Sequence, residues 1–328
     1  MIKLGTSGGS VSDISKLYCC GGTLGSAVTC NGAVHILSNN HVLARSGGAS
    51  PGEDTVQPGL IDTGCGGTNS NVVGDFLGDL VPLGSNVDAA LSLARAGAVS
   101  PTGEILGIGV PCATPKAPAI GMAVVKSGRT SGVTTGQVQA LNASISVQYQ
   151  VGCNQGKKFT VAYQNQVTIT PGTFLQSGDS GSLMLTDDAN HQPVGLLYAG
   201  SSSVAIANPI QDVIDAFLPK CGNAFGFVGG TCGASAFAAE AAAPTGGAVA
   251  AATAVKERHA AGLMTHPGVL GVGVGVAAGR SDQTTVVIYV DRGRPRPTLP
   301  ATLDGFRVDV VDTDPFVAMT GSCAPARR

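Results

Sequence analysis

The sequence predicts a mostly β body followed by a smaller unit that combines a helix with strands. Short runs rich in Val, Ile, Leu, Thr and Tyr recur through residues 15–220, and several alternate apolar with polar residues. Gly, Pro, Asn, Asp and Ser fill the gaps between these runs, and 48 glycines among 328 residues suit a chain full of tight turns. Beyond residue 232 the composition changes to an Ala-rich stretch, which indicates a boundary.

Regular short strands in the body favour a barrel or a sandwich. A helix is expected over residues 208–220, where apolar residues recur at helical spacing and Pro219 ends the pattern. The expected strands include residues 24–30, 34–39, 89–95, 122–128, 134–142, 144–150, 159–169, 181–186 and 194–200.

We expect three parts along the chain. Residues 1–232 form the body, residues 233–258 an Ala-rich linker or helix, and residues 259–328 a small α+β domain with a mobile tail. In the last part, residues 259–264 read as the end of a helix. Residues 269–276, 284–290 and 306–312 read as strands.

Charge and hydropathy exclude two classes of partner. The formal net charge is -2 and 12% of residues are charged, so the chain lacks the basic surface of a nucleic-acid-binding protein. No apolar run approaches the length of a membrane span, so we expect a soluble protein without a membrane partner.

The nine cysteines leave two interpretations open. No CxxC pair occurs, which argues against zinc-ribbon and thioredoxin-like sites. Either the cysteines are buried reduced thiols, or a few bridges coexist with unpaired residues; Cys221 and Cys232 could close a short loop. Because the count is odd and no secretory signal is recognisable, we expect a cytoplasmic protein, with secretion as the alternative.

Three short segments carry residues suited to nucleophilic catalysis. His41 lies in ILSNNHVLA (36–44), Asp88 in NVDAALSLA (86–94) and Ser180 in SGDSGSLML (177–185). A serine hydroxyl is a poor nucleophile at neutral pH and needs a base such as histidine within hydrogen-bond reach. The histidine in turn needs a buried carboxylate to fix its tautomer. Gly178 and the turn after it would let backbone N–H groups point at a developing oxyanion.

These segments resemble the signature blocks of chymotrypsin-fold, trypsin-like serine proteases of the bacterial type. The resemblance rests on GDSGS, on His41 followed by Val42, on VDAA, and on the order His, Asp, Ser. Residues 126–142 are similar to the entry of the second barrel in the streptogrisins, and the body is distantly similar to the plant Narrow Leaf 1 protein. The resemblance implies two six-stranded antiparallel β-barrels with a catalytic cleft between them.

The resemblance also implies a role for each matching residue. Ser180 would be the nucleophile, His41 the general base and then the general acid, and Asp88 the group that orients His41. The backbone N–H groups of Gly178 and Ser180 would form the oxyanion hole. No metal or cofactor is expected, because no third ligand is spaced to form a metal site with His259 and the histidine at position 266.

The resemblance places substrate contacts on two further segments. The strand Tyr198, Ala199, Gly200 would pair with the substrate backbone by β-addition. The base of the primary specificity pocket falls near Phe174, where no Asp occurs, so an apolar or small residue is expected there rather than Lys or Arg.

The chain departs from the family at three positions. Val42 stands where a Cys often follows the catalytic His. Asp179 is present, but no cleavable segment is seen that would supply a new N-terminus to pair with it. Tyr198 stands where a Ser often supports the catalytic Asp, which puts that support in doubt.

Two functions of different class follow, together with a weaker third. The first is a serine endopeptidase that acts on a protein or peptide substrate. The alternative is a latent protease-fold scaffold for binding or assembly, in which the C-terminal domain would form a homo-oligomer. The third is self-processing, with the Ala-rich linker as the accessible segment.

Overall fold

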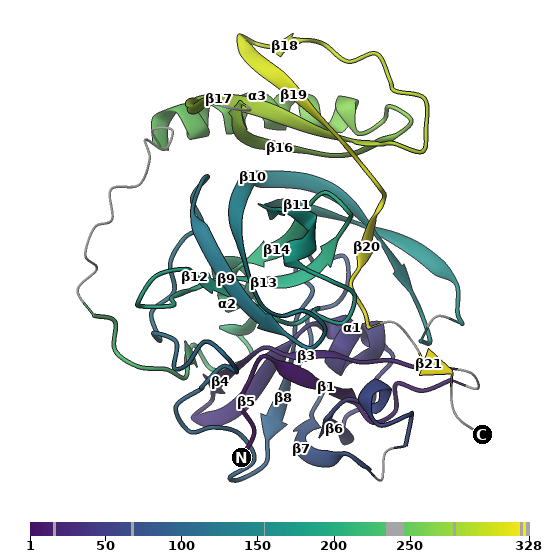
Figure 1. The fold of residues 1–328 in the computed structure, drawn as a ribbon, viewed down its shortest axis with the longest axis vertical. Helices are drawn as coiled ribbons and strands as arrows, with labels where there is room; N and C mark the ends of the chain where they lie inside the picture. The colour runs from purple at the N-terminus through teal and green to yellow at the C-terminus, as the bar shows by residue number, and fades with distance from the viewer. Residues whose placement is uncertain are drawn as a thin grey trace.

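The computed structural model describes residues 1–15, 18–66, 69–153, 155–233, 246–277, 280–321 and 324–325. Two large β-sheets dominate these residues, which confirms the mostly β expectation. In Figure 1 the N-terminal sheet lies at the bottom in purple, the second sheet lies above it in teal, and the C-terminal unit lies at the top.

The first sheet has eight strands and curves into a half-barrel. The chain passes from β3, at one edge of the sheet, to β4, which lies next to the strand at the other edge, with only Gly25 between them. The backbone N–H of Gly25 continues the pattern by donating to the carbonyl of Leu37, 3.0 Å away. In order across the sheet the strands are β15 (Phe225–Phe227), β4 (Ser26–Cys30), β5 (Ala33–Ser38), β8 (Ala90–Ala94), β7 (Asn71–Phe76), β6 (Glu53–Gln57), β1 (Thr6–Ser10) and β3 (Gly22–Leu24).

The second sheet closes into a ring of six strands, as the resemblance implied. Around the ring the order is β9, β10, β11, β14, β13 and β12, and β12 pairs with β9 to complete the circle. Apolar side chains from the ring form the interior cluster. The strands are β9 (Ala123–Gly128), β10 (Gly132–Gln150), β11 (Lys158–Thr170), β12 (Leu183–Thr186), β13 (Pro193–Gly200) and β14 (Ala205–Pro209). Helix α2 (Ile210–Phe217) follows, within the stretch expected to be helical.

The two strands expected over 134–142 and 144–150 are one bent strand. Asn142 adopts a left-handed φ of 51°, and the register with the neighbouring strand shifts on either side of Ala143. This irregularity bends β10, so that its first part pairs with β9 and its later part with β11. The expected break between the two strands fell at Ala143, next to this bend.

Several strands lack the apolar pattern that would predict them. Strand β1 reads TSGGS, and a Cβ atom built on Gly8 would lie 2.4 Å from Cγ of Leu24. Gly8 is required because β3 approaches β1 closely at this point. This contact between residues far apart in the chain cannot be predicted from local periodicity.

The C-terminal unit consists of a helix on a short sheet, with the expected strands in place. Helix α3 (Gly246–Leu263) packs on β16 (Val269–Ala277) and β17 (Arg280–Asp291), and β19 (Phe306–Thr313) pairs parallel to β17. Strand β18 (Thr302–Leu303) lies at the edge. The helix occupies part of the expected linker, and residues 234–245, where the self-processing segment was expected, lie outside the described residues.

This unit continues the second sheet, because β16 pairs antiparallel with β10. The alternation of Gly and Val in GVGVGV explains how the two strands pack. A Cβ atom on Gly271 would lie 2.8 Å from Cγ2 of Ile145, so this face must be bare, whereas Val272 on the other face packs in the apolar cluster under α3. The alternating glycines therefore allow β16 to pair closely with β10.

Part of the segment that was expected to be a mobile tail forms a strand. Strand β20 (Phe316–Ala318) pairs parallel with β10 and antiparallel with β13, and the side chain of Phe316 is fully buried. Figure 1 shows this strand descending from β19 toward α1, after which β21 (Ala324–Pro325) pairs with β2 (Tyr18–Cys19).

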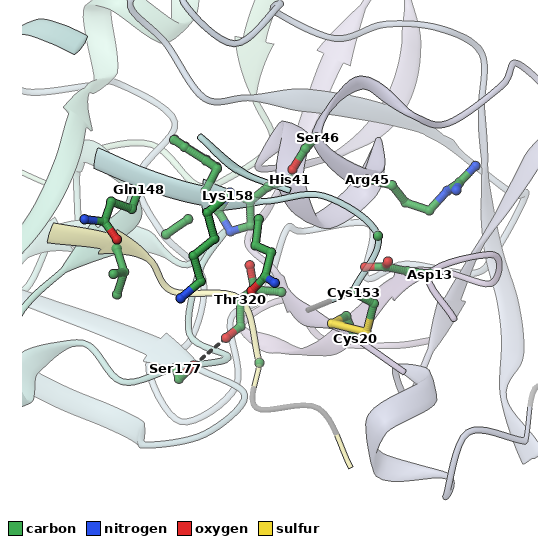
Figure 2. Close-up of a pocket in the computed structure, with 16 residues that line it drawn as sticks. Asp13, Cys20, His41, Arg45, Ser46, Gln148, Cys153, Lys158, Ser177 and Thr320 are labelled. Carbon is green, nitrogen blue, oxygen red and sulfur yellow. Dashed lines mark hydrogen bonds between the residues drawn. A yellow bond between two sulfur atoms is a disulfide. The ribbon is translucent and has the colours of Figure 1, made fainter. Parts of the chain in front are cut away.

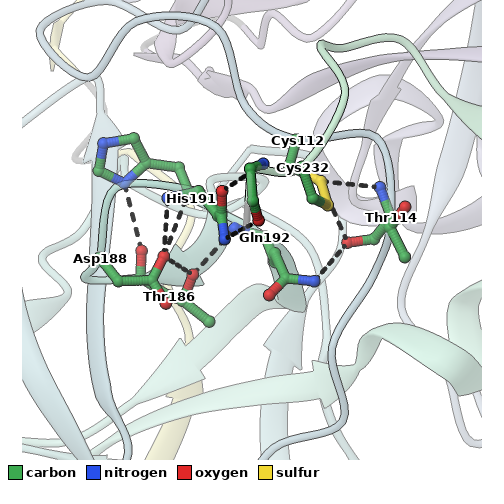
Figure 3. The surroundings of a disulfide bond; sticks show 9 residues. Cys112, Thr114, Thr186, Asp188, His191, Gln192 and Cys232 are labelled. Atoms are coloured by element: carbon green, nitrogen blue, oxygen red, sulfur yellow. Dashed lines mark hydrogen bonds between the residues drawn. A yellow bond between two sulfur atoms is a disulfide. The ribbon is translucent and has the colours of Figure 1, made fainter. Parts of the chain in front are cut away.

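Disulfides join eight of the nine cysteines, and Cys323 lies outside the described residues. The pairs, one of which is drawn in Figure 3, are Cys19–Cys65, Cys20–Cys153, Cys30–Cys221 and Cys112–Cys232.

This pairing corrects two expectations, the reduced thiols and the loop between Cys221 and Cys232. Because disulfides persist in oxidising compartments, the cytoplasmic expectation is wrong and the secreted alternative is favoured. Among the described helices, none combines the length and the apolar character needed to cross a bilayer.

Replacing Cys30 and Cys221 together by alanine should lower the free energy of unfolding by about 2–5 kcal/mol. The bond joins residues 191 apart in sequence, so its loss frees a very long loop in the unfolded chain, and both residues lie in the core. Urea titration followed by circular dichroism measures the change. An unfolding midpoint that neither the variant nor added reductant lowers would contradict this role.

Candidate active site

His41 is positioned by a short buried helix that follows a core strand. Helix α1 (Asn40–Leu43) begins directly after β5, and His41 is 3% exposed. The side-chain amide of Asn39 donates to the backbone carbonyl of Asp88 (2.7 Å), and that of Asn40 donates to the carbonyl of Val81 (2.8 Å). The two asparagines before the histidine therefore fasten α1 to the segment that carries Asp88.

The structure brings His41 and Asp88 into direct contact. Nδ1 of His41 lies 2.6 Å from Oδ2 of Asp88, and the backbone N–H of His41 donates to Oδ1 (3.3 Å). Because the partner of Nδ1 is a carboxylate, Nδ1 carries the proton and Nε2 is the basic nitrogen. Nε2 is buried and has no hydrogen-bond partner among the described residues. This is the orientation that a general base requires.

The support for Asp88 comes from Tyr149, which the sequence did not indicate. The Tyr149 hydroxyl donates to Oδ2 of Asp88 (2.9 Å) and lies 2.6 Å from the hydroxyl of Tyr163. Burial, and then the Asp88 charge, raise the pKa of Tyr149 well above its usual value, so this hydroxyl stays neutral and donates. Tyr198, at the position where a Ser often gives this support, has a buried hydroxyl without a partner in the described structure.

Ser180 lies in a loop that is pressed against the first sheet. The backbone N–H of Thr23, on β3, donates to the carbonyl of Ser180 (2.8 Å), and its hydroxyl donates to the carbonyl of Gly178 (3.0 Å). Gly178 has a φ of 102°, and a Cβ atom there would lie 2.3 Å from Oγ1 of Thr130. Only glycine fits this position, and the Gly178 N–H donates to the carbonyl of Met319, 2.8 Å away.

The hydroxyl of Ser180 does not bond to His41 in this structure. It donates instead to the backbone carbonyl of Tyr198, 3.0 Å away, and the residue is completely buried. The structure thus pairs His41 with Asp88, whereas the Ser180 hydroxyl bonds to a backbone carbonyl.

A buried ion pair fixes the residue before Ser180. Oδ2 of Asp179 lies 2.9 Å from Nζ of Lys126, and neither side chain is exposed. Backbone N–H groups of Thr130, Ser131 and Gln176 also donate to this carboxylate. Burial alone would raise the pKa of Asp179, but the Lys126 charge and these hydrogen bonds outweigh it and hold that pKa below its usual value. Lys126 thus supplies the cation that pairs with Asp179, a residue for which the sequence offered no new N-terminus.

The segments expected to contact substrate lie beside this loop. Ala199 and Gly200, expected to pair with a substrate backbone, pair with β20 of the same chain. Phe174 is 1% exposed and belongs to an apolar cluster with Leu175, so no charge lies at its position.

A cavity of about 220 Å³ adjoins His41 and is shown in Figure 2. Its wall includes Asp13, the Cys20–Cys153 disulfide and Thr320. Asp13 and the two sulfur atoms are close enough to hold a metal ion, but the sulfurs are bonded to each other and are not thiolate ligands.

The buried Asp13 carboxyl has an unusual pKa. Burial raises the pKa to about 6, although the nearby charges of Arg45 and His41 pull it down, and Glu53 adds to the rise. The Asp13 carboxyl therefore changes charge near pH 6, close to His41.

Comparison with known proteins agrees with this architecture. The model of the Nal1 C-terminal domain matches residues 66–211, a span that contains Asp88 and Ser180. No curated protein matches the chain.

Three solved structures illustrate the likeness. A glutamic acid specific serine protease described as using a novel histidine triad in substrate binding is 22% identical, with a TM-score of 0.45 over 66% of this chain and 97% of its own. Cellulomonas bogoriensis chymotrypsin is 22% identical, with a TM-score of 0.42 over 66% and 95%. Thermobifida fusca protease A is 19% identical, with a TM-score of 0.44 over 70% and 99%. The chain resembles bacterial chymotrypsin-fold serine proteases, as its motifs predicted.

Replacing Lys126 by methionine should lower the free energy of unfolding by about 3–5 kcal/mol, because it leaves the Asp179 charge buried and unpaired. Urea titration measures the loss. The double variant Lys126→Met, Asp179→Asn removes both charges and should recover part of the loss. A double variant less stable than the single variant would show that the ion pair does not cause the effect.

Replacing Asp13 by asparagine should stabilise the protein at pH 7.5 and have little effect near pH 4. A carboxyl whose pKa rises from 3.8 to about 6 on folding binds its proton more tightly in the folded state. It therefore makes the protein less stable as the pH rises from about 4 to 6, by up to about 3 kcal/mol. Thermal unfolding at both pH values tests this, and an equal shift at both would contradict it.

Proposed function

We propose that the protein is a serine endopeptidase that hydrolyses peptide bonds through an acyl-enzyme, with His41, Asp88 and Ser180 as its triad. The observation that carries the proposal is the buried contact of 2.6 Å between His41 and Asp88, which leaves Nε2 of His41 unpartnered among the described residues. A buried, correctly oriented imidazole at the junction of two sheets is the arrangement that serine activation needs.

The chemistry uses groups already in place. Rotation of the Ser180 side chain away from the Tyr198 carbonyl would turn its hydroxyl toward Nε2 of His41. As Oγ attacks the scissile carbonyl carbon, His41 takes the hydroxyl proton and the Asp88 charge stabilises the imidazolium. His41 then protonates the leaving amine, and water hydrolyses the ester with His41 again as base.

The loop before Ser180 would stabilise the oxyanion. The N–H of Gly178 is free to donate to a carbonyl oxygen, only glycine tolerates the backbone conformation there, and the Asp179–Lys126 pair holds the loop in that shape. Loss of one such donor costs on the order of 3 kcal/mol in characterised enzymes. The internal lysine means that the loop does not depend on a newly made N-terminus.

We further propose that the enzyme works outside the cytoplasm on protein or peptide substrates. The support is the set of four disulfides, which suits an oxidising environment. Assembly of a homo-oligomer through the C-terminal unit stays a prediction.

The latent state, our alternative, also has a specific observation in its favour. Strand β20 already occupies the edge of β13 that would receive a substrate, and Ser180 is completely covered. Latency of this kind is compatible with an intact catalytic apparatus.

Replacing Ser180 by alanine should lower peptide hydrolysis by about 10⁴-fold or more, because the nucleophile is lost. A Ser85→Ala variant, which changes an exposed serine in a turn, should keep the wild-type rate. Turnover of a fluorogenic peptide and labelling by an organophosphonate, mapped by mass spectrometry, measure both. Full proteolysis by the Ser180→Ala variant would refute the assignment.

A further inference from the structure

The segment from Phe316 to Gly321 runs through the site in the manner of a bound peptide. Val317 pairs with Gly200 and Ala318 with Ala199 in an antiparallel ladder. The ladder continues where the backbone N–H of Met319 donates to the carbonyl of Tyr198, 3.0 Å away. This is β-addition to the strand expected to bind substrate, and its occupant is part of the same chain.

The carbonyl of Met319 lies where a reacting carbonyl would lie. Its oxygen accepts a hydrogen bond of 2.8 Å from the N–H of Gly178, the donor assigned to the oxyanion hole. The carbonyl of Tyr198 accepts from both Met319 and Ser180, so Met319 and the nucleophile meet at one atom. Among the peptide bonds of this segment, the bond after Met319 is therefore the one presented to Ser180.

The chain beyond Met319 is held on the other side of the site. The hydroxyl of Ser177 donates to the carbonyl of Thr320, as Figure 2 shows, and the N–H of Gly321 donates to the carbonyl of Gly21 (2.8 Å). Hydrogen bonds thus hold the backbone on both sides of the Met319–Thr320 peptide bond. A tail that only rested on the surface would not need contacts on both sides.

The side chain of Met319 lies in an apolar setting. It packs against the cluster that contains Phe174 and Leu175, and its Cε lies 3.0 Å from where a Cβ on Gly200 would be. A glycine at 200 therefore leaves room for a long, unbranched apolar side chain. This agrees with the absence of charge at the expected specificity position.

We propose that the Met319–Thr320 peptide bond is a substrate of Ser180 in the same chain, and that the site prefers an unbranched apolar residue before the cut. The inference rests on the proposed function. Oγ of Ser180 bonds to the carbonyl carbon of Met319 as His41 takes its proton, and the bond to the nitrogen of Thr320 breaks as His41 returns that proton to the new amine. Water then hydrolyses the ester, which releases the Met319 carboxylate and restores the Ser180 hydroxyl.

The docked C-terminal unit would deliver this segment and retain it after the cut. The guanidinium of Arg292 donates to the hydroxyl of Ser203 (2.8 Å), and the ring of Phe316 packs edge-on against Tyr289. These contacts lie before the scissile bond, so cleavage does not release them. The new end at Met319 stays in the site as a bound product and slows the hydrolysis of other peptides.

The test compares the wild-type chain with Ser180→Ala and Met319→Asp after prolonged incubation. Intact mass and peptide mapping should show that the wild type loses everything after Met319 at a rate independent of protein concentration, while both variants stay whole. Because a carboxylate disfavours the apolar pocket, Met319→Asp should also open the site. A tethered occupant at a millimolar effective concentration competes strongly with a free peptide. Met319→Asp should therefore cleave a fluorogenic Phe-Val-Ala-Met-Thr-Gly peptide, and react with an organophosphonate, roughly tenfold faster than the wild type.

The control is Leu106→Asp, which adds the same charge at an exposed position and should behave as wild type. If Met319→Asp cleaves the peptide but the wild-type bond after Met319 stays whole, self-cleavage is wrong and the proposed function stands. If neither chain cleaves the peptide or reacts with the phosphonate, the proposed function fails and the inference fails with it.

Discussion

The burial of one carboxylate constrains the whole site. Asp88 is completely excluded from water, and an ionised carboxylate in such a place is tolerated only when its oxygens are satisfied by hydrogen bonds. Its donors come from both sheets, with His41 on α1 after the first sheet and Tyr149 on β10 of the second. Separating the two sheets would take the Tyr149 donor away from this buried charge and leave it with His41 alone. The carboxylate that orients the histidine therefore also links the two halves of the protein.

The loop that carries Ser180 follows the same principle with a different partner. Asp179 is buried beside the nucleophile, and Lys126 neutralises it from β9 at 2.9 Å. Removing either partner leaves a buried charge, so the loop is held in one conformation. Lys126 is part of the folded chain, so this conformation of the loop does not depend on a newly made N-terminus.

The elements that depend on neighbouring residues in the chain were predicted from the sequence. The β body, the helix over 208–220 and the strands of the C-terminal unit follow from periodicity, and the three motif segments supplied the expected triad positions. What was missed depends on contacts between distant residues. Tyr149 reaches Asp88 from 61 positions away, and Lys126 reaches Asp179 from 53 positions away. A disulfide between Cys20 and Cys153 gives no local signal either. The tail was misjudged because PFVAM carries little pattern of its own and gains its order from β13.

The glycine and valine alternation in β16 connects the fold to the fate of the tail. Bare glycines let β16 approach β10 closely enough to pair, and valines on the opposite face anchor α3. The C-terminal unit is thereby joined to the second barrel by backbone hydrogen bonds, with little freedom to swing. Strand β19 then ends close to the site, so β20 enters it without a long flexible connection, and little entropy is lost when it binds. A segment held this way would compete with free peptides through geometry alone, and it accounts for the complete burial of Ser180.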